Sequence, residues 1–374
     1  MERAYLKPNE ERRLLRGHAW AFRNEFERLP EAKDGETVDV YTQRKRFVGR
    51  GFYQAEGGIA VRILTRRQHD IDDGFLARRI DQAHALRKRT RPGHAAYRWV
   101  HGESDGLPGF VADRYGPVVI AESPCAFYAP HAAALAETFL AYPGVEGARV
   151  TVRGKTHEQG ELGEDLTVDL GGLTFGVPLS GGQKTGLFLD QQDNVLAARP
   201  LAEGARVLDG HCYAGVWSCH AAAAGARSVT GEDTSEAAIA RAKANAERNG
   251  VGERCVFETA DIGDALKRGE RYDLIILDPP ALAKSRGHVP KARGAYQTLN
   301  ANAMAALEPG GFLVTSSCSQ PVDQAAFTEI LKRAARAAQR DAVLLDSRGA
   351  GPDHPVLLQM PETAYLTCAV LQVH

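Results

Sequence analysis

The chain has 374 residues and a formal net charge of −1, a balance that argues against a nucleic-acid-binding protein because such domains usually carry a basic excess. The total conceals an uneven distribution. Residues 1–100 contain 22 lysines and arginines against 14 aspartates and glutamates, a net charge of +8, and residues 101–374 carry −9. An asymmetry of this kind indicates nucleic-acid contact by the basic end of the chain.

Length and composition set further bounds. The length predicts two or three domains, and 44% hydrophobic with 25% charged residues is typical of a globular protein. The sequence has no run of 18 apolar residues, so we expect no membrane span, and the charged N-terminus does not resemble a signal peptide. Six cysteines without a C-x-x-C pair do not form a disulfide framework, so we expect a reducing, cytoplasmic location.

Residues 1–70 are predicted to form a small β-barrel or sheet. Three segments rich in Val, Phe, Tyr and Ile, 36–41, 47–53 and 59–64, are separated by turn-forming stretches. Basic and aromatic residues are interleaved here, a combination suited to RNA because cations contact phosphates and rings stack on bases. The candidate RNA-binding residues of this domain are Arg16, Trp20, Arg23, Arg44, Lys45 and Arg46. The alternative is a barrel with ordinary core aromatics and a solvated basic face.

A central α+β domain is predicted over residues 71–178. Apolar residues recur at helical spacing over 72–90, which predicts a helix that ends before Pro92 and Gly93. Segments 118–122 and 148–152 have the composition of strands, and 130–142 has that of a helix. This part of the chain therefore mixes both kinds of element.

The pattern changes after Pro178 to a regular alternation of strands and helices. Strands are predicted over 205–209, 228–232, 272–277, 312–316, 342–345 and 365–373, and helices over 215–224, 234–249, 296–307 and 323–339. For the second of these helices, Thr234 is the expected N-cap and Gly250 follows its C-terminus. The continuous apolar run of 272–277 is typical of a central parallel strand buried on both faces. We therefore expect residues 179–374 to form a doubly wound, Rossmann-like α/β domain.

In such a sheet a ligand binds at the carboxyl ends of the strands. The first strand ends at Asp209, which stands where a dinucleotide site usually has its first glycine. Because the G-x-G-x-x-G motif is missing, a nicotinamide dehydrogenase is a poor alternative. A carboxylate at this position suits a ligand with a cationic amino group, such as S-adenosylmethionine. Asp233 after the second strand is placed to accept ribose hydroxyls, and Asp261 after the third is placed to face an adenine.

The fourth and fifth strands end in residues suited to catalysis. Asp278 is followed by Pro279 and Pro280, which hold the backbone extended and project the carboxylate into the pocket. Enzymes that methylate exocyclic amines usually have an aromatic residue next, and Ala281 stands there instead. Cys318, among hydroxyl residues after the fifth strand, is a candidate nucleophile. For Cys125, Cys255 and Cys368 we expect inert, buried thiols.

A metal site is the alternative for one cluster of residues. His211-Cys212 and Cys219-His220 have a spacing that resembles metal ligation. A closed tetrahedral site there would block the expected ligand turn, so we expect no metal.

At these residues the sequence resembles the bacterial PUA-domain ribosomal RNA methyltransferases that form 5-methylcytosine in large-subunit (23S) RNA. The resemblance covers nearly the whole chain. Its motifs are Gly17-His18-x-Trp20, residues 102–109 with Val111 and Asp113-Arg114, Gln183-Lys184-Thr185-Gly186, Phe188-Leu189-Asp190-Gln191, Asp278-Pro279-Pro280, Ser317-Cys318-Ser319 and Asp353-His354-Pro355. The chain departs from the family at His211, Ala214 and Val216, which implies a differently shaped adenosyl pocket.

The resemblance implies an enzyme, its cofactor and its partners. The domain over 1–70 would be a PUA domain, and the cofactor would be S-adenosylmethionine. The cofactor-binding residues would be Phe188, Asp190, Asp209, Tyr213, Gly215, Asp233, Asp261, Asp278 and Pro279. We expect 23S ribosomal RNA as the partner, either naked or in an assembling subunit, and we expect no membrane contact. The sequence leaves the oligomeric state open, and a homodimer is compatible with it.

The implied mechanism is covalent. Cys318 would attack C6 of cytosine, C5 would accept the methyl group, and Asp278 would hydrogen-bond or protonate N3. Lys184 and the N-terminal arginines would contact phosphates. The alternatives are methylation of another base, such as a guanine amine, and a non-catalytic RNA-binding assembly factor.

Overall fold

The structure is a computed structural model, and it describes residues 1–163, 165–178, 185–283, 287 and 289–374. The chain divides into two compact units. Unit 1 comprises residues 1–166, 177–187 and 352–363, and unit 2 comprises 167–176, 188–351 and 364–374. Each unit is therefore assembled from segments that are far apart in the sequence.

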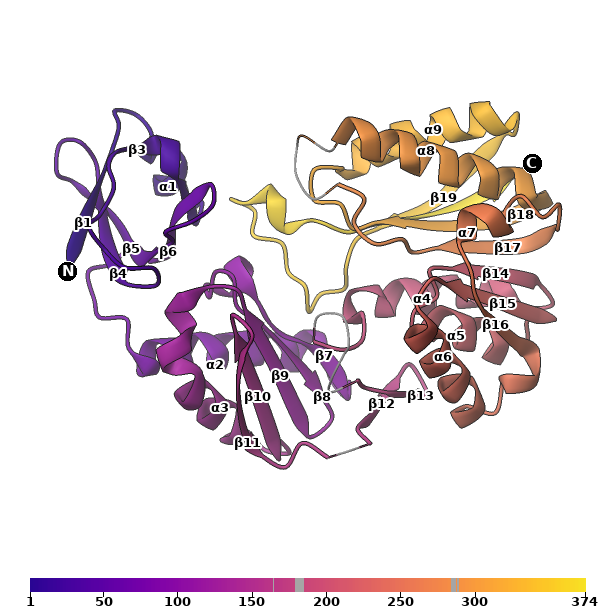
Figure 1. Cartoon of the computed structure of the whole chain (residues 1–374), viewed down its shortest axis with the longest axis horizontal. Helices are drawn as coiled ribbons and strands as arrows, with labels where there is room; N and C mark the ends of the chain where they lie inside the picture. The colour runs from indigo at the N-terminus through magenta and orange to yellow at the C-terminus, as the bar shows by residue number, and fades with distance from the viewer. Residues whose placement is uncertain (164, 179–184, 284–286, 288) are drawn as a thin grey trace. The chain divides into compact units, whose positions relative to one another are not determined.

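Unit 1 begins with a six-stranded sheet around its own apolar core (Figure 1). The strands are β1 (Glu2–Leu6), β2 (Trp20–Phe22), β3 (Phe26–Arg28), β4 (Thr37–Tyr41), β5 (Phe47–Tyr53) and β6 (Ile59–Thr65), in the order β2-β6-β5-β4-β1-β3, and the short helix α1 (Glu11–Leu15) follows β1. The three strands expected from composition are confirmed. β1, β2 and β3 were not predicted, because they are short or carry several charged residues.

The second part of unit 1 is a five-stranded sheet covered by two helices. The strands are β7 (Ala96–His101), β8 (Val111–Tyr115), β9 (Val118–Ser123), β10 (Gly147–Val152) and β11 (Lys155–Gly160), in the order β11-β10-β9-β8-β7, and the helices are α2 (Asp73–Thr90) and α3 (Ala132–Leu140). The core between them contains Ile80 from α2, Trp99 from β7 and Phe139 from α3, all fully buried. The helix predicted over 130–142 begins later than expected, because Pro130 belongs to a preceding 3-10 turn.

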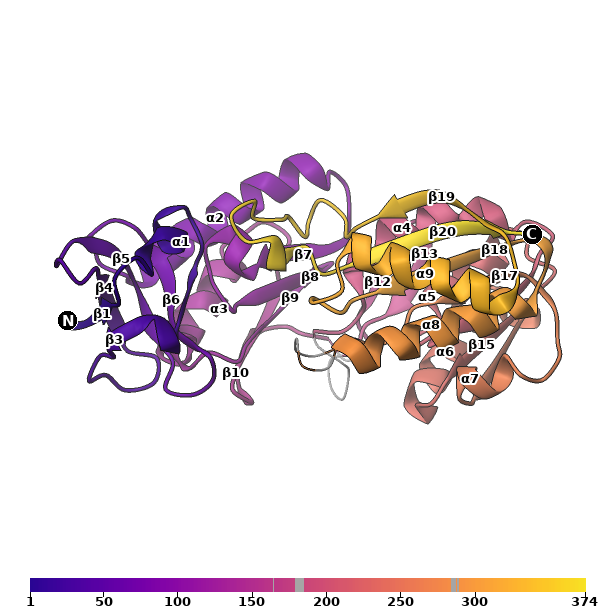
Figure 2. The ribbon, with the colours of Figure 1, turned by 90° about the horizontal axis from the view of Figure 1, so that it is seen from above.

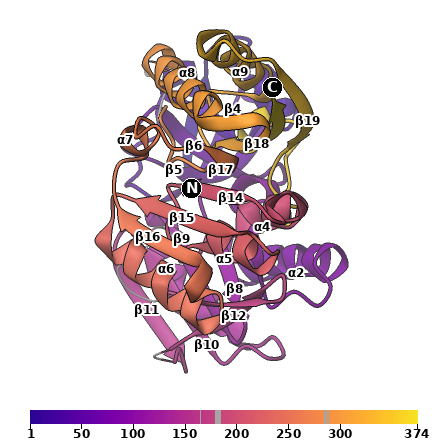
Figure 3. The same ribbon diagram turned by 90° about the vertical axis from the view of Figure 1, so that its right-hand side faces the viewer.

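Unit 2 is built on a seven-stranded sheet. Its strands are β14 (Arg206–Gly210), β15 (Ser228–Asp233), β16 (Cys255–Thr259), β17 (Tyr272–Leu277), β18 (Leu307–Ser317), β19 (Ala342–Arg348) and β20 (Thr367–Val373). Their order is β16-β15-β14-β17-β18-β20-β19, and Figure 3 shows the run from β16 through β14 and β17 to β18. The first five strands in this order are parallel, and β20 is antiparallel to both of its neighbours. The expected central position of β17 is confirmed.

Helices cover both faces of this sheet, as expected of a doubly wound domain. They are α4 (Gln192–Ala198), α5 (Val216–Ala223), α6 (Glu236–Arg248), α7 (Ile262–Ala265), α8 (Val289–Ala306) and α9 (Gln324–Ala338), and Figure 1 shows α8 and α9 on one side and α4, α5 and α6 on the other. Successive residues of β17 alternate between the two cores. Ile275 and Leu277 pack in the core that contains α8 and α9, whereas Leu274 and Ile276 pack in the core that contains α4 and α5.

Two segments depart from the predicted division of the chain at residue 178. The hairpin of β12 (Thr167–Leu170) and β13 (Leu173–Gly176) belongs to unit 2, where Asn249 of the turn after α6 bonds both the N–H and the carbonyl of Thr174. Residues 352–363 leave unit 2 and pack in unit 1, and Figure 2 shows this yellow segment beside α2 and β7. A buried ion pair between Arg91 and Asp353 holds it there.

The ends of α6 agree with the prediction more closely than the start of α8 does. α6 is capped by Ser235, whose hydroxyl accepts the N–H of Ala238 at 3.3 Å, and not by Thr234 as predicted. Gly250 follows the helix with φ +65°, as expected for a glycine after a helix C-terminus. α8 begins at Val289, earlier than the predicted Tyr296.

Candidate active site

The candidate active site lies at the carboxyl ends of the parallel strands of unit 2. β14 is flanked by β15 on one side and β17 on the other, so the strand order reverses beside it. Ligands of doubly wound domains bind at such a point. The predicted residues Asp209, Asp233, Asp278 and Cys318 all stand at or just beyond the ends of these strands. The backbone N–H of Asp278 bonds to the carbonyl of Gly210 at 3.3 Å, which joins the ends of β14 and β17.

The turn after β14 is tightly folded. His211 and Tyr213 both have positive φ, at 62° and 47°, and Gly215 has φ +74°. A Cβ on Gly215 would lie 3.0 Å from the Cβ of Ala242, so a side chain here would be strained and would crowd α6. The turn is fastened to β15, because the N–H of Cys212 bonds the Glu232 carbonyl at 3.0 Å. Burial lowers the pKa of His211, which leaves the ring neutral at physiological pH.

Asp209 is a fully buried carboxylate without a cationic partner in the described chain. Its Oδ2 accepts the Ser218 hydroxyl at 2.6 Å, and its Oδ1 has no hydrogen-bond partner among the described residues. Burial raises the pKa of Asp209 to about 7; the Ser218 hydrogen bond acts against this, and the charges of Asp278 and Asp233 add to it. A buried, unpartnered carboxylate oxygen is costly, and a cationic ligand would offset that cost.

Asp233 and Asp261 hold backbone N–H groups at neighbouring strand ends. Asp233 accepts from Tyr213 N–H at 3.1 Å and from Ser235 N–H at 2.9 Å, so it fixes the turn after β14. Asp261 is exposed and caps α7 through Gly263 N–H at 2.8 Å. Each carboxylate is thus held in place beyond a strand end, as the sequence predicted from chain order.

The predicted residues Phe188, Asp190 and Tyr213 make contacts within unit 2. The rings of Phe188 and Tyr213 meet edge to face with centroids 5.1 Å apart, which gives the turn an apolar wall. Asp190 is buried and accepts the Tyr365 hydroxyl at 2.5 Å. Asp190 therefore has a bonding role within unit 2, and its contact with a cofactor stays a prediction.

Asp278 is oriented by two neutral donors. The Gln191 side-chain amide donates to Oδ1 at 2.9 Å, and the Trp217 indole donates to Oδ2 at 3.3 Å. Gln191 is itself fixed, because its amide also donates to Ser316 at 3.0 Å and its carbonyl oxygen accepts from Asn194 at 2.7 Å. Neither Gln191 nor Trp217 was predicted from the sequence to belong to the site. Gln191 ended a recognised motif, but nothing in the sequence linked Trp217 to Asp278.

Cys318 stands just beyond the carboxyl end of β18. It is half-buried, and its thiol lies 3.6 Å from the Pro279 carbonyl, so the residues after β17 and β18 meet. Burial raises the thiol pKa of the other five, to about 11 at Cys255 and about 12 at Cys368, and also at Cys125, Cys212 and Cys219. A raised pKa keeps a thiol protonated and poorly nucleophilic.

The predicted RNA-binding residues of unit 1 fall into three groups. Arg44, Lys45 and Arg46 are exposed together on the turn between β4 and β5, and Arg16 is exposed after α1. Arg23 instead donates to the carbonyls of residues 54, 55 and 57, which occupies most of its guanidinium. The Trp20 indole donates to Glu103 at 2.7 Å and lies 5.4 Å from the Arg62 guanidinium. Lys184 lies outside the described residues.

The residues at the strand ends fit S-adenosylmethionine. Asp209 offers a buried carboxylate oxygen without a partner, and the glycine at 215 allows the backbone to turn closely beside it. Within the described chain no group of three or more His, Cys, Asp or Glu side chains is placed to hold a metal ion. No helix among the described residues is long and apolar enough to cross a membrane.

Comparisons with known proteins agree with this fold. Residues 4–66 match the PUA-like domain family, and residues 201–348 match a methyltransferase domain family. A protein from Streptococcus mutans assigned as a SAM-dependent methyltransferase superposes over 100% of both chains, with a TM-score of 0.87 and 21% identity. A second structure, assigned as a methyltransferase and complexed with SAH, has a TM-score of 0.89 at the same identity and coverage.

The sheet order, the strand-end site and these matches define an S-adenosylmethionine-dependent methyltransferase joined to a PUA-like domain. The ribosomal RNA large subunit methyltransferase I of Photobacterium profundum is 35% identical over 97% of both chains, and that of Pseudoalteromonas atlantica is 34% identical over 99% of both. The chain belongs to this family. The expected fold class, cofactor and PUA-like N-terminal domain are thereby confirmed.

Proposed function

We propose that the protein methylates C5 of a cytosine in large-subunit (23S) ribosomal RNA through a covalent bond to Cys318. The observation that carries this proposal is the half-buried Cys318 thiol, 3.6 Å from the Pro279 carbonyl and next to the strand end that bears Asp278. The names of the relatives supply the RNA as substrate. Such a substrate also implies action in the cytoplasm, where ribosomal RNA is modified.

The cofactor would be held by the turn after β14. Asp209 would face its cationic amino group, Asp233 its ribose hydroxyls and Asp261 its adenine, with Phe188, Tyr213 and Pro279 as apolar walls. When bound, S-adenosylmethionine supplies a methyl group on a positively charged sulfur. Asp209 and the charges around it favour a cationic ligand over a phosphate-bearing one.

A thiol is needed because C5 of cytosine is a weak nucleophile. The Cys318 thiolate attacks C6, and the C5–C6 double-bond electrons make C5 an enamine-like carbon. C5 would then bond to the methyl carbon as the bond between that carbon and the cofactor sulfur breaks, and the electrons of the broken bond would stay on sulfur. A base removes the C5 proton, and the electrons of that C–H bond restore the double bond as the Cys318 sulfur leaves C6. The thiolate is regenerated, so one methyl group is transferred for each cofactor consumed.

Asp278 would act on the other side of the base. Cysteine attack at C6 builds negative charge toward N3, and a protonated Asp278 would hydrogen-bond N3 and stabilise the adduct. Gln191 and Trp217 would hold this carboxyl group in one orientation through the bonds they donate. The target base must leave its stack to reach both groups.

The experiment is a methylation assay followed by product analysis. The full chain is incubated with labelled S-adenosylmethionine and large-subunit ribosomal RNA that lacks modification, and the RNA is digested to nucleosides. We expect the label in 5-methylcytidine. Label in a methylguanosine would overturn the base assignment, and cofactor binding without turnover on any RNA would favour an assembly factor.

The same assay on two cysteine variants tests the nucleophile. Cys318→Ala should abolish turnover and retain S-adenosylmethionine binding. Cys255→Ala is the matched control, because Cys255 is the other partly exposed cysteine and burial raises its pKa to about 11. A Cys318→Ala protein that still turns over would end the covalent mechanism.

A further inference from the structure

A basic hollow lies in unit 1 where β6 leads into α2. It encloses about 510 Å³. Its described lining consists of Leu64, Thr65, Arg66, Arg67, His69, Phe75, Arg78, Arg79 and Gln82. Four of these nine residues are arginines, and no described lining residue is acidic. None of the four was among the candidate RNA-binding residues taken from the sequence.

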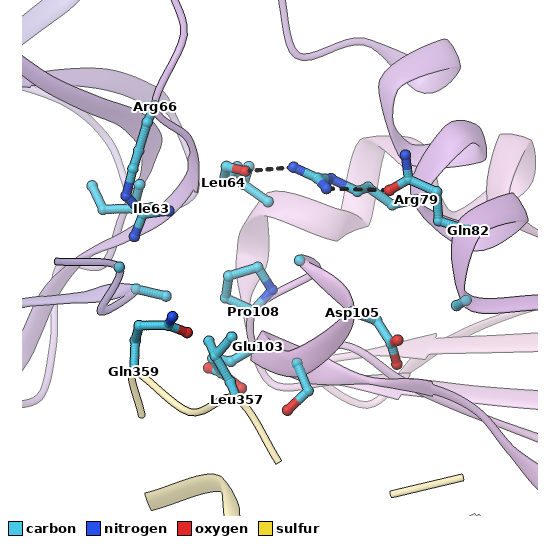
Figure 4. Close-up of a pocket in the computed structure, with 15 residues that line it drawn as sticks. Ile63, Leu64, Arg66, Arg79, Gln82, Glu103, Asp105, Pro108, Leu357 and Gln359 are labelled. Atoms are coloured by element: carbon cyan, nitrogen blue, oxygen red, sulfur yellow. Dashed lines mark hydrogen bonds between the residues drawn. The ribbon is translucent and has the colours of Figure 1, made fainter. Parts of the chain in front are cut away.

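A second hollow of about 410 Å³ adjoins the first, since both are lined by Leu64, Arg66, Arg79 and Gln82. Figure 4 shows this second hollow, with the Arg66 and Arg79 side chains on either side of Leu64. Its two acidic residues are already paired within the fold. Glu103 bonds Arg62 at 2.5 Å and Asp105 bonds Arg87 at 2.6 Å, so neither neutralises Arg66 or Arg79.

The fold itself positions these two guanidiniums. Arg66 donates to the carbonyls of Leu14 at 3.2 Å and His18 at 3.1 Å, and Arg79 donates to the Leu64 carbonyl at 3.4 Å. Neutral carbonyls hold the guanidiniums without cancelling their charge. Burial, and then repulsion from a neighbouring arginine, lowers the pKa of both Arg66 and Arg79. Two adjacent cations without an anion are unfavourable, and a bound anion would relieve their repulsion.

Aromatic groups lie beside the arginines. The Arg79 guanidinium is 5.2 Å from the centre of the buried Phe75 ring, and the exposed His69 ring is 5.6 Å from the same ring. Cations together with an exposed ring match the needs of a single-stranded nucleotide, which offers a phosphate and a flat base. A guanidinium fork also suits phosphate oxygens better than a single ammonium does.

We propose that this hollow binds a phosphodiester of the RNA substrate, with Arg66 and Arg79 as the main donors and Arg67 and Arg78 at its edge. The inference rests on the proposed function, because it assigns a contact for that same RNA. The hollow differs from the turn at 44–46, because the three cations of that turn are exposed on the surface and do not line either hollow. The hollow would fix the position of one strand segment and leave its sequence unread.

The test measures RNA binding by the full chain. The probe is a fluorescein-labelled single-stranded RNA oligonucleotide from large-subunit ribosomal RNA, followed by anisotropy across a salt series. The double variant Arg66→Ala with Arg79→Ala is compared with Arg89→Ala with Arg333→Ala. The control pair removes the same charge from exposed arginines that do not line either hollow. Thermal unfolding and S-adenosylmethionine binding verify that each variant is folded.

We expect the hollow variant to lose roughly tenfold or more in affinity near physiological salt, because charge-assisted contacts are lost. The slope of log affinity against log salt concentration should fall by about 0.7 for each phosphate contact removed. The control should lose less than about twofold. Equal losses in both variants would overturn the proposal, as would no loss in the hollow variant. A wild-type chain that binds no RNA would contradict the proposed function instead.

Discussion

Two fully buried aspartates, one in each unit, have opposite environments. Asp353 of unit 1 accepts two bonds from Arg91, at 2.6 and 3.0 Å, and the Arg98 N–H at 2.9 Å. Burial by itself would raise its pKa, but contacts with His354 and Arg91 outweigh burial and hold the pKa well below its ordinary value. Asp209 of unit 2 is bonded by neutral groups of Ser218, its Oδ1 has no hydrogen-bond partner among the described residues, and burial raises its pKa to about 7.

The difference separates a carboxylate that holds the fold together, Asp353, from a carboxylate with one oxygen available for a ligand, Asp209. In unit 1 the buried acids are matched to arginines; these pairs are Asp39–Arg50, Asp105–Arg87, Asp113–Arg98 and Asp353–Arg91. At the strand ends of unit 2, Asp209 and Asp278 accept bonds from a hydroxyl, an amide and an indole. Removing an acid should therefore have opposite consequences in the two units.

The largest effect should come from Asp353→Asn. The variant leaves Arg91 buried without a matching charge, so we expect the free energy of unfolding to fall by about 3–5 kcal/mol. Urea denaturation at neutral pH measures this loss. Asp346→Asn is the control, since Asp346 pairs with Arg348 at an exposed position and should change stability little. Equal stability of the two variants would contradict the structural role of Asp353.

Asp209→Asn should raise the free energy of unfolding instead of lowering it. A pKa raised from 3.8 to about 7 means that Asp209 contributes stability that is fully present below pH 3.8 and is lost as the pH rises to about 7. At about pH 8 the ligand-free variant should therefore be more stable than the wild type, by at most about 4 kcal/mol. Below pH 4 the two proteins should agree. Lower stability of the variant at pH 8 would show that Asp209 has a partner in the fold.

Cofactor affinity should follow the same titration. A cationic ligand binds the ionised Asp209, so S-adenosylmethionine affinity should weaken by up to about tenfold for each pH unit below 7 and level off above it. Calorimetric titration between about pH 6 and pH 8 measures the change. In Asp209→Asn the affinity should be weaker and independent of pH in this range. If the wild-type protein bound S-adenosylmethionine equally well at the lowest and the highest pH of this range, Asp209 would not contact the cofactor.

The smallest effect concerns the orientation of Asp278. Gln191→Ala removes one donor to that carboxylate, at a cost of about 1 kcal/mol, so kcat should fall by roughly tenfold or less. The S-adenosylmethionine affinity should not change, because the expected role is to position Asp278. Gln324→Ala, at an exposed amide bonded to Ser347, is the matched control. An unchanged kcat in Gln191→Ala would contradict the positioning role of Gln191.

The sequence predicted best those features that depend on local pattern. The apolar run of β17 and the acids that follow successive strands were found because parallel strands bring their carboxyl ends to one edge. Contacts between distant segments had no such signal. Gln191 meets Asp278 and Arg91 meets Asp353 only after the chain folds. The basic hollow was also missed: its arginines come from the loop after β6 and from α2, and only their shared pocket distinguishes them from solvated charges.

A covalent bond between Cys318 and cytosine C6 can be trapped with RNA in which 5-fluorocytidine replaces cytidine. Methyl transfer to such a base leaves no C5 proton to remove, so the adduct cannot resolve. We expect a protein–RNA complex that survives denaturing electrophoresis, requires S-adenosylmethionine, maps to the peptide containing Cys318 and is absent from Cys318→Ala. A wild-type protein that methylates unsubstituted RNA but forms no such complex, or a complex that persists in Cys318→Ala, would contradict the covalent mechanism.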